Sequence, residues 1–237
     1  MDNNGLIFSI DKQDVTGQPG QTILEVADAA GIYIPRLCKF KDLLPGGHCR
    51  ICTVRVNGRP TNACTAKAAE GLVVENDTEE LNAFRRNVLE MLLVEGNHTC
   101  PACEVSGSCE LQALAYRFGI TKPKYPYLNQ DRPVDASHPD VYVDRNRCIL
   151  CGRCAQASAQ IDGKMVFGYE GRGIDMRVTV DSAADLVDTD LSGTDVAVES
   201  CPTGCLVRKR QAYRTPVGQR PYDKAPIGAK IETARKG

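Results

Sequence analysis

The sequence predicts an α+β protein divided into several small units. Three observations support this prediction: short strand and helix patterns follow one another along 237 residues, 42% of the side chains are hydrophobic, and 12 cysteines fall into separate groups. The apolar content is sufficient for a folded core. No uninterrupted apolar stretch approaches the roughly 20 residues that a membrane-spanning helix needs, so we expect no membrane contact.

The start of the chain indicates a cytoplasmic protein. Asp2 stands where a secretory signal would carry Lys or Arg, and no long apolar region follows it. The 12 cysteines make up less of the chain than the roughly 8 to 10% that marks a secreted disulfide scaffold. Because a reducing cytoplasm disfavours disulfides, we expect these cysteines to bind metal.

Residues 1–77 are expected to form a β-rich unit in which a sheet grasps one helix. Thr22 and Glu25 have the spacing of a capping box, which begins a short helix, and Gly31 can end it in the left-handed region. Asn57-Gly58 is a strong signal for a two-residue hairpin turn. The predicted strands are Leu6–Ile10, a short strand from Val15, Thr53–Val56, Arg59–Cys64 and Leu72–Glu75.

Residues 78–121 are expected to form a small helical unit. Asp77 and Glu80 have capping-box spacing, and Gly96 ends the helical pattern that follows them. A shorter helix is predicted from Glu110 to Phe118. The side chains expected to face the core along the longer helix are Leu81, Phe84, Val88 and Leu92.

Residues 122–140 contain four prolines and are interpreted as an irregular linker. Residues 141–210 form the third predicted unit, and residues 211–237 form a basic tail. The strands predicted in the third unit are Val141–Val143, Met165–Tyr169 and Met176–Val180.

Charge is distributed unevenly toward the C-terminus. From Arg208 onward, nine basic residues face two acidic ones, a net of +7, whereas the whole chain has a formal net charge of −1. The tail lacks the interleaved aromatic residues and the folded basic face that are typical of nucleic-acid binding. We therefore expect no nucleic-acid partner, and a tail that lies along a protein partner or stays solvated.

The most specific cysteine pattern is C-x2-C-x2-C at Cys148, Cys151 and Cys154, followed by the remote pair Cys201-Pro202. In ferredoxins, one tight loop of this kind offers three thiolates to a cubane cluster, and a distant cysteine completes the set. A structural zinc site is the alternative for these residues. Zinc sites usually pair two C-x2-C arms, so the pattern favours a [4Fe-4S] cluster.

The first cysteine group has the spacing C-x10-C-x2-C-x11-C, and its members are Cys38, Cys49, Cys52 and Cys64. Four thiolates beside a small sheet suit a [2Fe-2S] cluster, with two thiolates for each iron. A zinc site with four cysteines remains an open alternative. Gly46 and Gly47 would let the backbone approach the cluster, and His48 is interpreted as a loop residue.

The middle group contains only three cysteines, Cys100, Cys103 and Cys109, at C-x2-C-x5-C. Three thiolates leave one corner of a cubane open, and His98 lies two residues before the first of them. Because an imidazole can ligate iron, His98 is the candidate fourth ligand. Cys205 is left over and is interpreted as a buried packing residue.

These motifs resemble those of a known family. The segments CPACEVSGSCELQ (100–112), RCILCGRC (147–154), CPTGCL (201–206) and GGHCRIC (46–52) are similar to the N-terminal iron–sulfur region shared by three proteins. These are the large iron–sulfur subunit of respiratory complex I, iron-only hydrogenases, and the small diaphorase subunit of NAD-reducing [NiFe]-hydrogenases. The resemblance covers roughly residues 5–210, and the length of the chain looks most like that of the diaphorase subunit.

The resemblance implies a β-grasp [2Fe-2S] ferredoxin domain, a small helical domain with a His/Cys3 cluster, and a ferredoxin-like [4Fe-4S] domain. One position departs from the family pattern: the family places its histidine four residues before the first cysteine, where this chain has Gly96. The implied ligand sets are Cys38, Cys49, Cys52 and Cys64 for [2Fe-2S]; His98, Cys100, Cys103 and Cys109 for one [4Fe-4S]; and Cys148, Cys151, Cys154 and Cys201 for the other.

The functional hypothesis is an electron relay with no catalytic residues of its own. The sequence has no G-x-G-x-x-G or phosphate-binding loop after a strand, so we expect no NAD or FMN site on this chain. The expected partners are a flavin/NAD-binding diaphorase subunit and the small and large hydrogenase subunits. Two alternatives remain: the same relay in an NAD-dependent formate dehydrogenase or a minimal complex I, and a structural scaffold held together by zinc.

Overall fold

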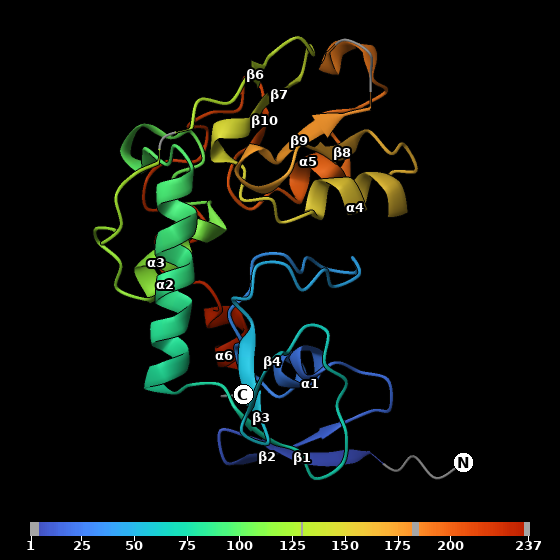
Figure 1. Ribbon diagram of the computed structural model, residues 1–237, viewed down its shortest axis with the longest axis vertical. Coiled ribbons are helices and arrows are strands. Elements are labelled where there is room, and N and C mark those ends of the chain that lie inside the picture. The colour runs from blue at the N-terminus through green and yellow to red at the C-terminus, as the bar shows by residue number, and fades with distance from the viewer. Residues whose placement is uncertain (1–4, 129, 182–184, 235–237) are drawn as a thin grey trace.

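The computed structural model describes residues 5–128, 130–181 and 185–234. Figure 1 shows a sheet formed by the N-terminal part of the chain, a long helix α2 (Glu79–Glu95), and a second group of short strands and helices formed by the C-terminal part. The buried apolar side chains form three clusters. Within the described ranges, no helix is long and apolar enough to cross a membrane.

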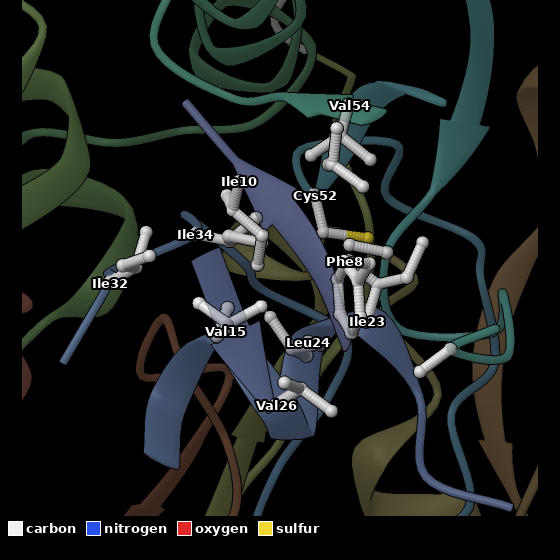
Figure 2. Close-up of a cluster of buried hydrophobic side chains, with 14 of the residues drawn as sticks. Phe8, Ile10, Val15, Ile23, Leu24, Val26, Ile32, Ile34, Cys52 and Val54 are labelled. Atoms are coloured by element: carbon white, nitrogen blue, oxygen red, sulfur yellow. The ribbon is translucent and has the colours of Figure 1, made fainter. Parts of the chain in front are cut away.

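The N-terminal sheet has five strands in the order β2-β1-β5-β3-β4. Strands β1 and β5 are parallel, and the other neighbouring pairs are antiparallel. Helix α1 (Ile23–Ala29) packs against the sheet, and Figure 2 shows side chains of both in one core, where Cys52 lies beside Phe8 and Ile23. The strands are β1 (Leu6–Ile10), β2 (Gln13–Gly17), β3 (Thr53–Val56), β4 (Arg59–Asn62) and β5 (Val73–Glu75).

The local signals in this first part of the chain are confirmed. The Thr22 hydroxyl accepts a hydrogen bond from the Glu25 backbone N–H at 3.2 Å, and the Glu25 carboxylate accepts one from the Thr22 N–H at 2.7 Å. Gly31, at φ +71°, follows the helix end. Asn57 (φ +48°) and Gly58 (φ +81°) form the turn between β3 and β4, as a two-residue hairpin requires.

The predicted start of α2 was wrong by one residue. The N-cap is Thr78, whose hydroxyl accepts a hydrogen bond from the Leu81 N–H at 3.2 Å. The Asp77 carboxylate instead accepts from the side chain of Asn82, and the Glu80 carboxylate pairs with Arg55 of β3. Neither carboxylate therefore takes part in a capping box, because each binds a side chain elsewhere.

The buried face of α2 also differs from the predicted stripe. Leu81 and Leu89 are buried, but Phe84 is 40% exposed. The side chain between them on the buried face is Arg85, which is 1% exposed and donates hydrogen bonds to the carbonyl oxygens of Ile51 and Thr53 at 3.1 and 2.9 Å. Arg85 lies on the buried face because backbone carbonyls around β3 accept its hydrogen bonds. The helical spacing of apolar residues in the sequence gives no sign of these carbonyls.

The second helix, α3 (Glu110–Arg117), matches its prediction and packs against α2. The third part of the chain contains a three-stranded sheet in the order β10-β7-β6 and the hairpin β8-β9. Strand β6 lies in the segment that we interpreted as an irregular linker. The elements are β6 (Val134–Asp135), β7 (Val141–Asp144), β8 (Phe167–Glu170), β9 (Arg177–Val180), β10 (Leu206–Arg208), α4 (Arg153–Gln160) and α5 (Val196–Glu199).

The described part of the C-terminal segment is partly docked on its own chain. Residues 211–219 are exposed, whereas residues further on contact the fold. That the exposed part lies along a protein partner stays a prediction. The described segment ends in α6 (Ala229–Ala234). Arg117 of α3 donates a hydrogen bond to the Ile227 carbonyl at 2.8 Å and pairs with Glu232. Ile227 is buried in the same apolar cluster as Tyr33. Figure 1 shows α6 near the N-terminal sheet rather than extending away from the fold.

Candidate metal centres

The first cysteine set lies in the loop between α1 and β3 and just after β4. Three of its members are almost fully buried, and Cys49 is half-buried. The neighbouring thiols of Cys49 and Cys64 lower the pKa of Cys38. The neighbouring Cys64 thiol also lowers the pKa of Cys52. Cys38 therefore lies near Cys49 and Cys64, and Cys52 lies near Cys64.

Backbone N–H groups around this set point toward sulfur. The backbone N–H groups of His48 and Cys49 lower the pKa of Cys38. Gly47 (φ +66°) and Arg50 (φ +58°) adopt the left-handed conformations that turn the loop. Hydrogen bonds of this kind stabilise a thiolate and tune the potential of a cluster bound to it.

The second set lines one small cavity. Its walls include Cys100, Cys103 and Cys109 together with His98. Cys109 is the N-cap residue of α3, and its sulfur accepts a hydrogen bond from the Gln112 N–H at 3.4 Å. Burial raises the pKa of Cys109 to about 12, so a cation must compensate its thiolate if it is to ionise there.

His98 lines this cavity, and its ring carries an unpaired nitrogen. Its Nε2 atom is buried and has no hydrogen-bond partner. Burial, together with the nearby charge of Arg147, lowers the pKa of His98 to about 4. A neutral ring with an unpaired nitrogen is the form in which histidine binds metals.

The third set surrounds another small cavity, whose walls include Cys148, Cys151, Cys154 and Cys201. The Cys148 sulfur accepts a hydrogen bond from the Leu150 N–H at 3.4 Å, because Leu150 takes a left-handed conformation (φ +52°). Burial raises the pKa of Cys151 to about 12. A buried, largely apolar site lined by cysteines suits thiolate ligands of a cationic iron core.

Cys205 occupies an unexpected place. We interpreted it as a packing residue, and it is indeed buried in the apolar cluster of the third unit. However, it also lines the cavity of the third set, where its neighbouring thiol lowers the pKa of Cys148. The only sequence signal for this position is its distance of four residues from Cys201.

The second and third sets are neighbours. Thr203, which is 3% exposed, lines both cavities, and its hydroxyl donates a hydrogen bond to the Arg147 carbonyl at 2.7 Å. Sequence reasoning did not single out Thr203. In the parts of the chain that the structure describes, no three His, Cys, Asp or Glu side chains converge as the ligands of one single metal ion would.

Together, the fold and these donor sets define an iron–sulfur protein, and comparison with protein families supports this class. Residues 4–79 match the 2Fe-2S iron-sulfur cluster binding domain. Residues 85–124 match the NADH-ubiquinone oxidoreductase-G iron-sulfur binding region, and residues 138–207 match the ferredoxin-like domain of NADH-quinone oxidoreductase subunit 3. The predicted fold class, a [2Fe-2S] domain and [4Fe-4S]-binding regions are thereby confirmed.

Comparison with individual proteins is more specific. The chain is 37% identical over 225 residues to the gamma subunit of the NAD-reducing hydrogenase HoxS of Cupriavidus necator, covering 94% of this chain and 95% of that one. The chain therefore belongs to the family of NAD-reducing hydrogenase gamma subunits. It also superimposes on a chain in the crystal structure of NAD+-reducing [NiFe]-hydrogenase in the H2-reduced state, with a TM-score of 0.92, 45% identity, and coverage of 97% and 98%.

A more distant relative shares only part of its length with this chain. The 78 kDa mitochondrial subunit of NADH-ubiquinone oxidoreductase from Candida albicans is 33% identical over 210 residues, which are 87% of this chain but 29% of the relative. The resemblance noticed in the cysteine motifs is confirmed by these comparisons, as is the prediction of an iron–sulfur electron-transfer subunit of an NAD-reducing hydrogenase.

Proposed function

We propose that this chain relays single electrons through three iron–sulfur clusters, between a hydrogenase module of small and large subunits and a flavin/NAD-binding diaphorase subunit. The observation that carries the proposal is the presence of three buried or half-buried donor sets in one chain, two of which line cavities that share the wall residue Thr203. In this proposal, the reactions of hydrogen and of NAD take place on the partner subunits.

The proposed ligands are the residues that surround each site. Support for the first set comes from the close approach of its sulfurs, and support for the other two comes from the cavities that they line. The assignments are [2Fe-2S] on Cys38, Cys49, Cys52 and Cys64; [4Fe-4S] on His98, Cys100, Cys103 and Cys109; and [4Fe-4S] on Cys148, Cys151, Cys154 and Cys201.

The place of Cys205 differs from that of the proposed ligands of the third set. Cys205 lies in the buried apolar cluster of the third unit, beside Cys148, whose pKa it lowers. Cys201 has another environment: its sulfur accepts a hydrogen bond from the Leu206 N–H at 3.4 Å. Cys205 is thus proposed as a hydrogen-bond donor to a ligand, and Cys201 as the ligand.

Iron–sulfur clusters, when bound, supply one-electron carriers whose potentials depend on ligands, charge, hydrogen bonds and solvent exposure. The chain itself excludes water and provides N–H groups that face sulfur. Gln112, Leu150 and Leu206 each donate a backbone hydrogen bond of 3.4 Å to a proposed ligand. These contacts favour the charged forms of the ligands in otherwise apolar surroundings.

The first test is metal analysis of the complex purified without oxygen. The proposal requires about ten iron atoms per copy of this chain, two for the [2Fe-2S] cluster and four for each [4Fe-4S] cluster, with matching sulfide, after subtraction of the iron in the partner subunits. A few zinc atoms, with no iron attributable to this chain, would contradict the proposal and favour a structural scaffold held together by zinc.

The second test separates relay from chemistry. Replacing Cys201 by Ser should abolish hydrogen-dependent reduction of NAD, while oxidation of NADH with an artificial acceptor at the flavin subunit persists. Cys205→Ala is the matched control, because it removes a cysteine from the same cavity without removing a proposed ligand. The relay assignment fails if Cys201→Ser leaves both activities intact.

A further inference from the structure

The guanidinium group of Arg153 is buried where the three ligand-bearing parts of the chain meet. Arg153 is the first residue of α4 and is 2% exposed. Its two terminal nitrogens form a bidentate pair with the Glu110 carboxylate, at 2.6 Å (Nη1 to Oε1) and 2.7 Å (Nη2 to Oε2). A bidentate pair of this kind fixes the orientation of the guanidinium relative to the carboxylate as well as the distance between them. A lysine ammonium would not fix this orientation.

The same guanidinium also binds two backbone carbonyls. Nη2 donates to the Lys39 carbonyl at 3.1 Å, and Nη1 donates to the Ser200 carbonyl at 3.2 Å. The Phe40 ring lies against the guanidinium, with its centroid 5.2 Å from the central carbon. One side chain therefore holds backbone from the first and third units and a carboxylate from the second.

Every partner of Arg153 is next to a proposed ligand in sequence. Lys39 follows Cys38, Glu110 follows Cys109, and Ser200 precedes Cys201. Arg153 itself precedes Cys154. The contacts of one buried guanidinium thus reach segments of all three donor sets.

The guanidinium of Arg153 is connected to the third set in particular. Arg153 lies between Cys151 and Cys154 in sequence, and it binds the Ser200 carbonyl next to Cys201. Glu110, whose side chain is 22% exposed, compensates part of the positive charge of Arg153. In a buried site the field of an uncompensated charge is weakly screened, so removing either member of the pair changes the local field substantially, and in opposite directions.

We propose that Arg153 is a positioning residue that clamps the ligand segments of all three sets together and whose charge, partly cancelled by Glu110, raises the reduction potential of the cluster at Cys148, Cys151, Cys154 and Cys201. This inference rests on the proposed function, in which these sets hold iron–sulfur clusters. A positive charge favours the reduced cluster because reduction adds a negative charge to it.

The test is a redox titration of the intact complex, followed by electron paramagnetic resonance. Glu110→Gln removes the compensating carboxylate with little change in shape, and it should shift the midpoint potential of this cluster upward. Arg153→Gln leaves the carboxylate unpaired and should shift the potential downward. Both substitutions break the same ion pair, so a purely structural role would not produce shifts of opposite sign.

Two further variants complete the experiment. Arg153→Lys keeps the positive charge but not the bidentate geometry of the guanidinium. Its midpoint potential should therefore lie much closer to that of the wild type than the potential of Arg153→Gln does. Glu232→Gln is the matched control, since it breaks the other bidentate Arg–Glu pair, Arg117 with Glu232, which lines neither cluster cavity. It should leave the potential unchanged.

The outcomes separate this inference from the proposed function. If the wild-type chain contains no iron, the proposed function fails and the inference fails with it. If the wild type contains its full iron and sulfide, but Glu110→Gln leaves the potential unchanged or lowers it, only the inference is overturned. The Glu110→Gln result decides the question even if Arg153→Gln does not fold.

Discussion

A side chain on Gly96 would collide with the ring of His98 and with the backbone of Asn146: an ideal Cβ atom at Gly96 would lie 2.6 Å from Nε2 of His98 and 2.7 Å from the Asn146 carbonyl oxygen. Gly96 is the position at which the family pattern places its histidine. The space left empty by Gly96 is therefore taken by the ring of a histidine two residues later. This arrangement gives a physical reason for the shifted spacing, and it makes Gly96 part of the His98 site.

Gly96→Ala should displace the His98 ring and the backbone at Asn146. Gly96 has an ordinary backbone conformation (φ −105°, ψ 172°), so the effect would come from these clashes and not from backbone strain. We expect an altered electron paramagnetic resonance signal for the second set, with a normal signal for the first set. Gly168→Ala is a suitable control, because the nearest atom to its added Cβ lies at 3.8 Å. An unchanged spectrum in Gly96→Ala would contradict the role of this gap.

Replacing His98 itself tests ligation. His98→Cys should retain the cluster but lower its midpoint potential, because a charged thiolate would replace a neutral nitrogen. His98→Ala should reduce iron content, or leave a cluster with an open iron site. Iron analysis combined with a redox titration measures both effects. Full iron content and an unchanged potential in His98→Ala would show that the fourth ligand is another group.

The buried Arg85 should be important for stability. Its guanidinium donates to backbone carbonyls of β3 and of the segment before α2, including Asn76 at 2.8 Å. Arg85→Ala would leave several buried acceptors unpaired, at about 1–3 kcal/mol each, so a loss of about 3 kcal/mol or more is expected. The measurement is anaerobic thermal unfolding of the chain with its clusters.

The adjacent Arg86 provides the control for Arg85. Arg86 is exposed and makes a single hydrogen bond to the Phe118 carbonyl. Arg86→Ala should change stability by no more than about 0.5 kcal/mol, as exposed substitutions usually do. Equal effects of the two substitutions would contradict the structural role assigned to Arg85.

The folded-back C-terminal segment should depend on Gly228. Gly228 has φ +93°, and a Cβ atom there would lie 2.3 Å from the Tyr33 ring. Gly228→Ala should release the segment and accelerate tryptic cleavage at Lys224 and Lys230. Gly218, at φ +90° with no atom within 4 Å of its ideal Cβ, is the matched control: Gly218→Ala imposes similar strain without the clash. Equal cleavage rates in the two variants would argue against docking through Tyr33.

Much of this fold could be predicted because its signals are local. The capping box at Thr22, the Asn57-Gly58 turn and the C-x2-C-x2-C loop each depend on a few consecutive residues whose backbone preferences are known. The errors occurred where distant partners intervene. Thr78 caps α2 because its competitor Asp77 accepts a hydrogen bond from Asn82, and Phe84 is exposed because Arg85 faces the backbone of β3.

From the sequence alone we predict which side chains hold metal and how they divide into three sets, because ligand type and loop spacing are properties of short segments. What surrounds each set depends on the folding of the whole chain. Folding places the His98 ring in the space beside Gly96, the Cys205 thiol next to Cys148, and Arg153 against Glu110. These contacts join residues from separate segments, and their energies depend on burial and on charges brought together only by folding.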